Sequence, residues 1–142
     1  MNQLVNPSIV LDNHPQGAAT TSNFRIANQP IRQLKAGEFL IENIWLSMDP
    51  YTRPRLNENT AYVEPIKLGQ VIQGETIGKV VESNSPKYQV GDSVFTFSGW
   101  QKYCIANDAD FYDVSIAGHA AAANDLFECS RHSGSSRVFW FE

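Results

Sequence analysis

The pattern of short apolar runs before residue 110 constrains the fold of this chain more than any other feature. Runs rich in Val, Ile, Phe, Tyr and Thr alternate with clusters of Gly, Pro, Asn and Asp, and helical periodicity is nearly absent. Strands at this spacing, with no helix between them, favour an antiparallel barrel over a sheet built from βαβ units. The sequence therefore predicts a mainly β fold, a partly open barrel with few short helices.

The predicted strands differ in how much of their surface is apolar. Residues 38–46 are mostly apolar on both faces, which indicates a buried strand. Residues 71–82 form a second long strand, in which Gly74 and Gly78 predict a bulge or a bend where another backbone comes close. Shorter strands are expected at residues 8–11, 23–27, 93–97 and 101–106.

The connection formed by residues 49–67 is different in kind. Asp49 is placed to cap a short helical turn, with Pro50 at the first helical position, and Pro54 either ends the turn or starts a loop. Long connections inside a compact β domain often carry functional residues, because the scaffold holds them in place. We therefore expect a site in this connection.

The length and charge of the chain exclude several classes of protein. The 142 residues suffice for one hydrophobic core, and the net charge of −4 provides no basic surface for nucleic acid. No apolar run approaches the ~18 residues of a membrane span, and the N-terminal residues lack the features of a signal peptide. These observations predict a cytoplasmic protein that binds neither nucleic acid nor membrane.

The cysteines and histidines do not form a recognisable metal or disulfide framework. Cys104 and Cys129 are too few for a disulfide scaffold and do not form a Cys-x-x-Cys pair. We expect Cys104 to be a reduced core thiol. The three histidines show no i, i+4 pair that would place two imidazoles on one helical face. The sequence thus predicts no metal site.

Several short motifs occur in an order that resembles a known family. They are Trp-Leu-Ser-Met-Asp-Pro-Tyr-Thr-Arg at residues 45–53, Gly-Lys-Val-Val-Glu-Ser at 78–83, Gly-Asp-Ser-Val at 91–94 and Gly-Trp-Gln-Lys-Tyr at 99–103. Each motif alone is weak, but their order and spacing resemble the N-terminal domain of the zinc-independent medium-chain dehydrogenases/reductases. The most similar branch is that of the prostaglandin, leukotriene and curcumin reductases, and the resemblance runs from about residue 8 to residue 107.

This resemblance implies a GroES-like barrel and an oxidoreductase activity. Members of the family pass hydride from NADPH to the β-carbon of α,β-unsaturated ketones or aldehydes, so the substrate carbonyl becomes an enolate. A hydroxyl donor at that oxygen lowers the barrier, and a tyrosine remains protonated at working pH. Family members are usually homodimers, and the sequence leaves the oligomeric state of this chain open.

The resemblance also implies roles for particular residues. Tyr51 and Tyr62 match family positions that face the substrate cleft, which makes them the candidate catalytic donors; the alternative is ordinary packing with the hydroxyl in water. Trp45 and Trp100 are candidates for lining the substrate pocket, and buried packing is the alternative for both. Arg53 is expected to brace the loop or to contact a cofactor phosphate.

The zinc-dependent relatives carry Gly-His-Glu where this chain has Gln73, Gly74 and Glu75, and Asp49 stands near the position of a ligating cysteine. Because the histidine is missing, a tetrahedral zinc site with Cys and His ligands cannot be built. The resemblance therefore implies NADP(H) as the cofactor and no zinc.

The end of the chain does not match the family. Residues 108–142 lack the glycine-rich strand-to-helix turn whose amides hold a dinucleotide pyrophosphate in a Rossmann domain. We therefore expect residues 1–107 to form the GroES-like oxidoreductase domain and residues 108–142 to be a non-matching, disordered or frameshifted tail. A frameshift is considered because Gly-His-Ala at 118–120 can be encoded by bases that give Gly-Met-Pro one position later.

The sequence thus supports one leading interpretation and two alternatives. The leading one is the substrate-side domain of an NADP(H)-dependent alkenal/one reductase, truncated before its cofactor domain and inactive alone. The alternatives are a stand-alone GroES-like domain that binds a partner or small ligand, and a non-functional truncated product.

Overall fold

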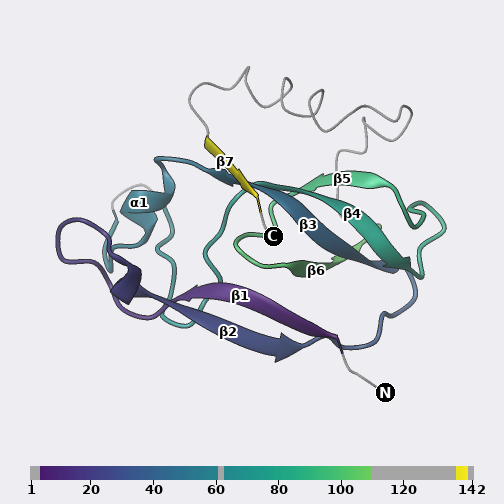
Figure 1. The fold of residues 1–142 in the computed structure, drawn as a ribbon, viewed down its shortest axis with the longest axis horizontal. Coiled ribbons are helices and arrows are strands. Elements are labelled where there is room, and N and C mark those ends of the chain that lie inside the picture. Colours follow the sequence, from purple (N-terminus) through teal and green to yellow (C-terminus); the bar gives the residue numbers. More distant parts are fainter. Residues whose placement is uncertain (1–3, 61–62, 110–136, 141–142) are drawn as a thin grey trace.

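The computed structural model describes residues 4–60 and 63–109, together with the backbone of residues 137–140. Strands dominate these residues, as predicted, and α1 is the α-helix among them (Figure 1). In chain order the elements are β1 (Val5–Leu11), the 3₁₀ turn η1 (Thr21–Asn23), β2 (Phe24–Pro30), β3 (Glu38–Met48), α1 (Thr52–Arg55), β4 (Thr76–Ser83), β5 (Ser93–Thr96), β6 (Tyr103–Asn107) and β7 (Arg137–Trp140).

The strands form two antiparallel sheets that main-chain hydrogen bonds connect. One sheet consists of β1 and β2, and the other has the order β5-β4-β3-β6, with β7 also paired to β3 (Figure 1). Between the sheets, Ile9 N donates to Trp100 O at 2.8 Å and Ile72 N donates to Ile9 O at 3.0 Å. These bonds place β1 against two segments that flank the larger sheet, which produces the predicted partly open barrel.

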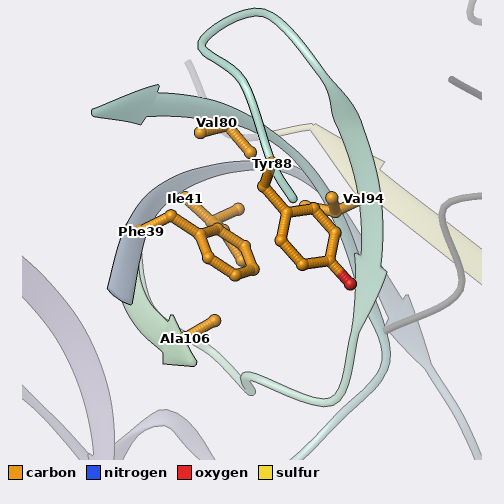
Figure 2. Close-up of a cluster of buried hydrophobic side chains, with 6 residues drawn as sticks. All are labelled: Phe39, Ile41, Val80, Tyr88, Val94 and Ala106. Atoms are coloured by element: carbon orange, nitrogen blue, oxygen red, sulfur yellow. The ribbon is translucent and has the colours of Figure 1, made fainter. Parts of the chain in front are cut away.

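The main core cluster lies inside the curve of the larger sheet. Figure 2 shows its side chains pointing toward one another: Phe39, Ile41, Val80, Tyr88, Val94 and Ala106. The rings of Phe39 and Tyr88 stack with their centroids 4.2 Å apart. Phe39 and Ile41 are fully buried, so the prediction of a buried strand at residues 38–46 is confirmed.

A second cluster holds the region around α1 against the barrel. It consists of Leu11, Leu56, Ile66 and Ile72, with Ile9, Phe24 and Trp100 packed against it. Leu56 is the residue that caps the C-terminal end of α1. The burial of Leu56 therefore fixes the short helix, although a helix of this length has little stability of its own.

Gly78 marks the closest approach of β3 and β4. A Cβ at this position would lie 2.5 Å from Glu42 O and 2.6 Å from Ile41 Cγ2, closer than real Cβ contacts. The pairing register of β3 with β4 shifts around Ile44, next to this contact. The prediction that Gly78 marks a bulge or a close backbone approach is confirmed.

The start of β4 differs from the prediction. The strand begins at Thr76 and not at residue 71, because the preceding residues bond to β1 instead. Val71 forms an isolated bridge with Val10, and Ile72 N donates to Ile9 O. The apolar run at residues 71–82 therefore contains two segments: residues 71–72 bond to β1, and β4 begins only at Thr76. Gly74 lies between these segments.

The helix cap also differs from the prediction. Tyr51 is the N-cap of α1, whereas the Asp49 carboxylate accepts a hydrogen bond from Ser47 Oγ at 2.9 Å. Pro54 lies inside α1 and does not end it. A proline is tolerated there because N–H groups in the first turn of a helix have no acceptor within the helix.

Part of the expected tail belongs to the larger sheet. β7 pairs antiparallel with β3 from Trp45 to Met48, so residues 137–140 have a backbone partner that the sequence did not predict. Residues 110–136 and 141–142 of that tail lie outside the described residues. No helix among the described residues is both long and apolar enough to cross a membrane.

Glu38, at the start of β3, is held by a charged partner. Arg32 Nη1 and Nη2 donate to its two carboxylate oxygens at 2.6 and 2.8 Å, and Lys35 N donates to one of them at 2.8 Å. The hydrogen bonds from Arg32 and then from Lys35 lower the pKa of Glu38 from 4.5 to about 2.

We expect the substitution Glu38→Gln to lower the free energy of unfolding at pH 7 and to have little effect near pH 2. A carboxyl whose pKa is lowered by folding stabilises the chain above its ordinary pKa, and this contribution is lost as the pH falls toward 2. Urea unfolding at both pH values measures the difference, with the exposed Glu82→Gln as control. An equal gap between variant and parent at both pH values would contradict the prediction.

Candidate functional site

Tyr51 stands at the N-terminal end of α1, separated from β3 by Asp49 and Pro50, and 38% of its surface is exposed. Burial of the remainder raises the pKa of Tyr51, and so do the charges of Asp49 and Glu75, whereas Arg55 acts in the opposite direction. The phenol is therefore protonated at neutral pH, and its hydroxyl can donate a hydrogen bond. Its exposure leaves it within reach of a small molecule.

Ser47 connects the two acidic residues that act on Tyr51. Ser47 N donates to Glu75 O at 2.9 Å, and Ser47 Oγ donates to the Asp49 carboxylate at 2.9 Å. Burial raises the pKa of Glu75, and the charge of Asp49 raises it further. The end of β3 thus brings two carboxyl groups to one phenol, and both oppose its ionisation.

Gly74, the position where the resemblance implies a histidine in zinc-dependent relatives, lies beside Trp100. A Cβ at Gly74 would lie 3.2 Å from Trp100 Nε1, 3.4 Å from Leu46 Cδ1 and 3.4 Å from Ser47 O. Trp100 Nε1 is itself buried and has no hydrogen-bond partner among the described residues. A side chain at position 74 would therefore require the indole to shift by a few tenths of an ångström.

Gln73 joins the same segment to α1. Arg55 Nη2 donates to Gln73 Oε1, and Arg55 Nε donates to Glu64 O at 3.2 Å. Three consecutive residues thus have three different partners: Gln73 binds α1, Gly74 contacts Trp100, and Glu75 bonds to β3. We call residues 73–75 and Tyr51 the candidate site.

Arg53, Trp100 and Trp45 are the other predicted site residues that the structure describes, and each has partners of its own. Arg53 Nη1 donates to Asn57 Oδ1 at 2.8 Å and its Nη2 donates to Gly17 O, which is the bracing role expected of it. Trp100 packs on the second core cluster, with its ring 5.9 Å from that of Phe24. Trp45 is partly buried and pairs in register with Ile77 of β4.

Tyr62 lies outside the described residues. Glu75 and Arg55 are the residues to which the sequence assigned no role. Glu75 comes near Tyr51 only in the folded chain, so no local motif could have linked the two. Arg55 stands four residues after Tyr51 at the end of α1, a spacing that is visible in the sequence. The structure therefore enlarges the predicted site by two charged groups.

Cys104 is a free, partly buried thiol, and burial raises its pKa to about 11. It is therefore protonated at neutral pH, which agrees with the expected reduced thiol; Cys129 lies outside the described residues. Within residues 4–60 and 63–109, no three His, Cys, Asp or Glu side chains are grouped so that they could hold a metal ion.

Comparison with known proteins gives consistent matches. A family described as the N-terminal domain of oxidoreductase matches residues 8–114. The NADPH-dependent curcumin reductase of Escherichia coli (strain K12) is 41% identical over 110 residues, which are 78% of this chain and 31% of that protein. The 2-alkenal reductase (NADP(+)-dependent) of Nicotiana tabacum is 36% identical over 108 residues, 72% of this chain and 31% of that protein.

A solved structure also matches the fold. The crystal structure of CurA in complex with NADPH from Vibrio vulnificus superposes with a TM-score of 0.74 at 33% identity, covering 81% of this chain and 34% of that chain. The present chain therefore spans about a third of the length of the proteins it matches.

We expect the substitution Glu75→Gln to lower the pKa of Tyr51, because it removes a nearby negative charge that opposes ionisation of the phenol. Tyrosinate absorbance during a pH titration measures the shift, after subtraction of the same titration of Tyr51→Phe. The exposed Glu82→Gln serves as control, since Glu82 lies on β4 outside the site. A Tyr51 titration that Glu75→Gln leaves unchanged would exclude this electrostatic coupling.

Proposed function

Because this chain belongs to the family of N-terminal oxidoreductase domains, we propose that it is the substrate-side domain of an NADP(H)-dependent reductase of α,β-unsaturated ketones and aldehydes. The predicted GroES-like fold and zinc-independent reductase branch are confirmed by these relatives. The names of the curcumin and 2-alkenal reductases support the substrate class. The observation that carries the proposal is Tyr51, a protonated and accessible phenol in the expected loop.

The proposed chemistry needs a hydrogen-bond donor more than it needs a base. Reduction of the C=C bond at the β-carbon moves negative charge to the carbonyl oxygen of the substrate. Tyr51 Oη donates to that oxygen, and the bond strengthens as the charge develops. Asp49 and Glu75 oppose loss of the phenolic proton, so Tyr51 acts as a donor throughout.

Tyr62 is proposed as a second donor at the same oxygen, on the strength of its family position alone. Trp45 and Trp100 are proposed to line the substrate pocket. For Trp100, the support is its contact with Gly74, which places the indole beside the candidate site. The role of Trp45 rests on its position in the motif.

The described residues do not fit NADP(H) as a complete site. Arg53, the basic residue expected near a cofactor phosphate, already donates to Asn57 and Gly17. The described part of the chain has one four-residue α-helix and no strand that leads through a glycine-rich turn into a helix, so it offers no helix N-terminus for a pyrophosphate. The cofactor is therefore assigned to protein beyond these residues, and no reaction step is drawn through it.

The division of the chain follows from this assignment. We propose that residues 1–107 form the substrate-side domain and that residues 108–142 are a non-matching or frameshifted tail, of which β7 pairs with β3. The match covers about a third of each relative's length, which supports the assignment of residues 1–107 to one domain of a reductase.

We expect a fluorescence titration to show no saturable binding of NADPH to the 142-residue chain. A chimera that joins residues 1–107 to the remaining sequence of the Escherichia coli relative should bind NADPH, because the missing phosphate-binding amides are restored. Tight, stoichiometric binding by the 142-residue chain alone would contradict the proposed division. A stable complex with a different small molecule would favour a stand-alone binding domain instead.

We expect the substitution Tyr51→Phe in that chimera to lower kcat by roughly 10² or less, the lower end expected for loss of one donor, while the affinity for NADPH is unchanged. Steady-state reduction of an enone measures kcat. Tyr103→Phe on β6 is the matched control, because Tyr103 lies outside the candidate site. Unchanged turnover in Tyr51→Phe would remove this residue from the mechanism.

A further inference from the structure

Within β3, the regular alternation of N–H groups between the two edges of the strand is reversed. Asn43 N donates to Lys102 O at 2.8 Å, toward β6, whereas Ser47 N donates to Glu75 O at 2.9 Å, toward β4. In a regular strand, residues four apart point their N–H groups to the same edge. The register shift around Ile44 accounts for the change, because one extra residue reverses the alternation.

This reversal determines which amides face β7. Beyond Ile44, the N–H groups of Leu46 and Met48 point away from β4, to the edge where β7 lies. In the register of the two strands, Leu46 pairs with Phe139 and Met48 with Arg137. These are therefore the pairs that exchange N–H···O bonds in an antiparallel ladder.

The pairing with β7 continues the sheet where β6 no longer contributes. β6 pairs with β3 from Glu38 to Glu42, whereas β7 pairs with it from Trp45 to Met48 (Figure 1). Leu46 is buried, but Met48, the last residue of the strand, is 38% exposed. Burial of its side chain therefore contributes little to keeping Met48 in place. A strand end with few buried contacts opens easily unless its backbone is bonded on both edges.

We propose that the pairing of β7 with β3 is a positioning contact for the candidate site: it holds the strand end from which Asp49 and Tyr51 follow. Met48 directly precedes Asp49, and Ser47 bonds to both Asp49 and Glu75. Opening of this strand end therefore separates the two carboxyl groups from the phenol and leaves the main core intact. The importance of this position for catalysis rests on the proposed function, whereas the contact itself does not.

Amide hydrogen exchange in the full 142-residue chain tests the proposal. Phe139→Pro removes the N–H group that faces Leu46, whereas Val138→Pro removes one that faces away from β3 and is the matched control. We expect Phe139→Pro to speed exchange at Leu46 and Met48 by about tenfold, the effect of losing a ladder hydrogen bond. Ser47 should also exchange faster, because its bond to Glu75 breaks when the strand end opens, whereas Ile41 in the core should exchange at the parent rate.

A second measurement connects the strand end to the site. In Phe139→Pro the titration of Tyr51 should move to lower pH, since its acidic neighbours are no longer held beside it, and Val138→Pro should leave it unchanged. The proposal is overturned if Leu46 and Met48 keep their parent rates in Phe139→Pro, if both proline variants act alike, or if Ile41 loses protection as well. Failure of the proposed function would instead show as unchanged turnover in Tyr51→Phe, whatever the exchange rates.

Discussion

The candidate site depends on the close approach of β3 and β4 at Gly78. No side chain fits there, because a Cβ would meet the carbonyl oxygen of Glu42 at 2.5 Å. The bulge around Ile44 lies beside this contact and reverses the alternation of the N–H groups in β3. As a result, Ser47 N points to Glu75, and the strand delivers Asp49 and Tyr51 next to residues 73–75. A backbone contact in the barrel thus determines the electrostatic surroundings of a phenol at its end.

Position 74 lies between the Trp100 indole and the acidic Glu75. In this chain glycine allows the Trp100 indole to lie close, since a Cβ at position 74 would be 3.2 Å from Trp100 Nε1, and the adjacent Glu75 acts on Tyr51 by its charge. The local arrangement therefore favours hydrogen-bond donation to a developing oxyanion. Nearby negative charge keeps the donor protonated and also makes the site less favourable for an anionic ligand.

Sequence patterns predicted the elements that depend on local spacing and failed where partners come from elsewhere in the chain. The buried β3 strand and the close approach at Gly78 follow from apolar runs and glycine positions, because these reflect the environment of each residue. The cap at Asp49 was wrong, since Ser47 takes up its carboxylate. The start of β4 was wrong because β1 bonds to the residues before it. A short stretch of sequence does not show which of two backbone partners a residue will bond to.

By itself, the sequence determined the mainly β class, the motif order that identified the family, and Tyr51 as a candidate donor, because all three depend on residue type and spacing along the chain. The tertiary structure decided which groups surround that donor. Glu75 acts on Tyr51, and β7 pairs with the strand that precedes it, although both lie elsewhere in the chain. Charge interactions and strand pairing act through space, so only the folded arrangement establishes them.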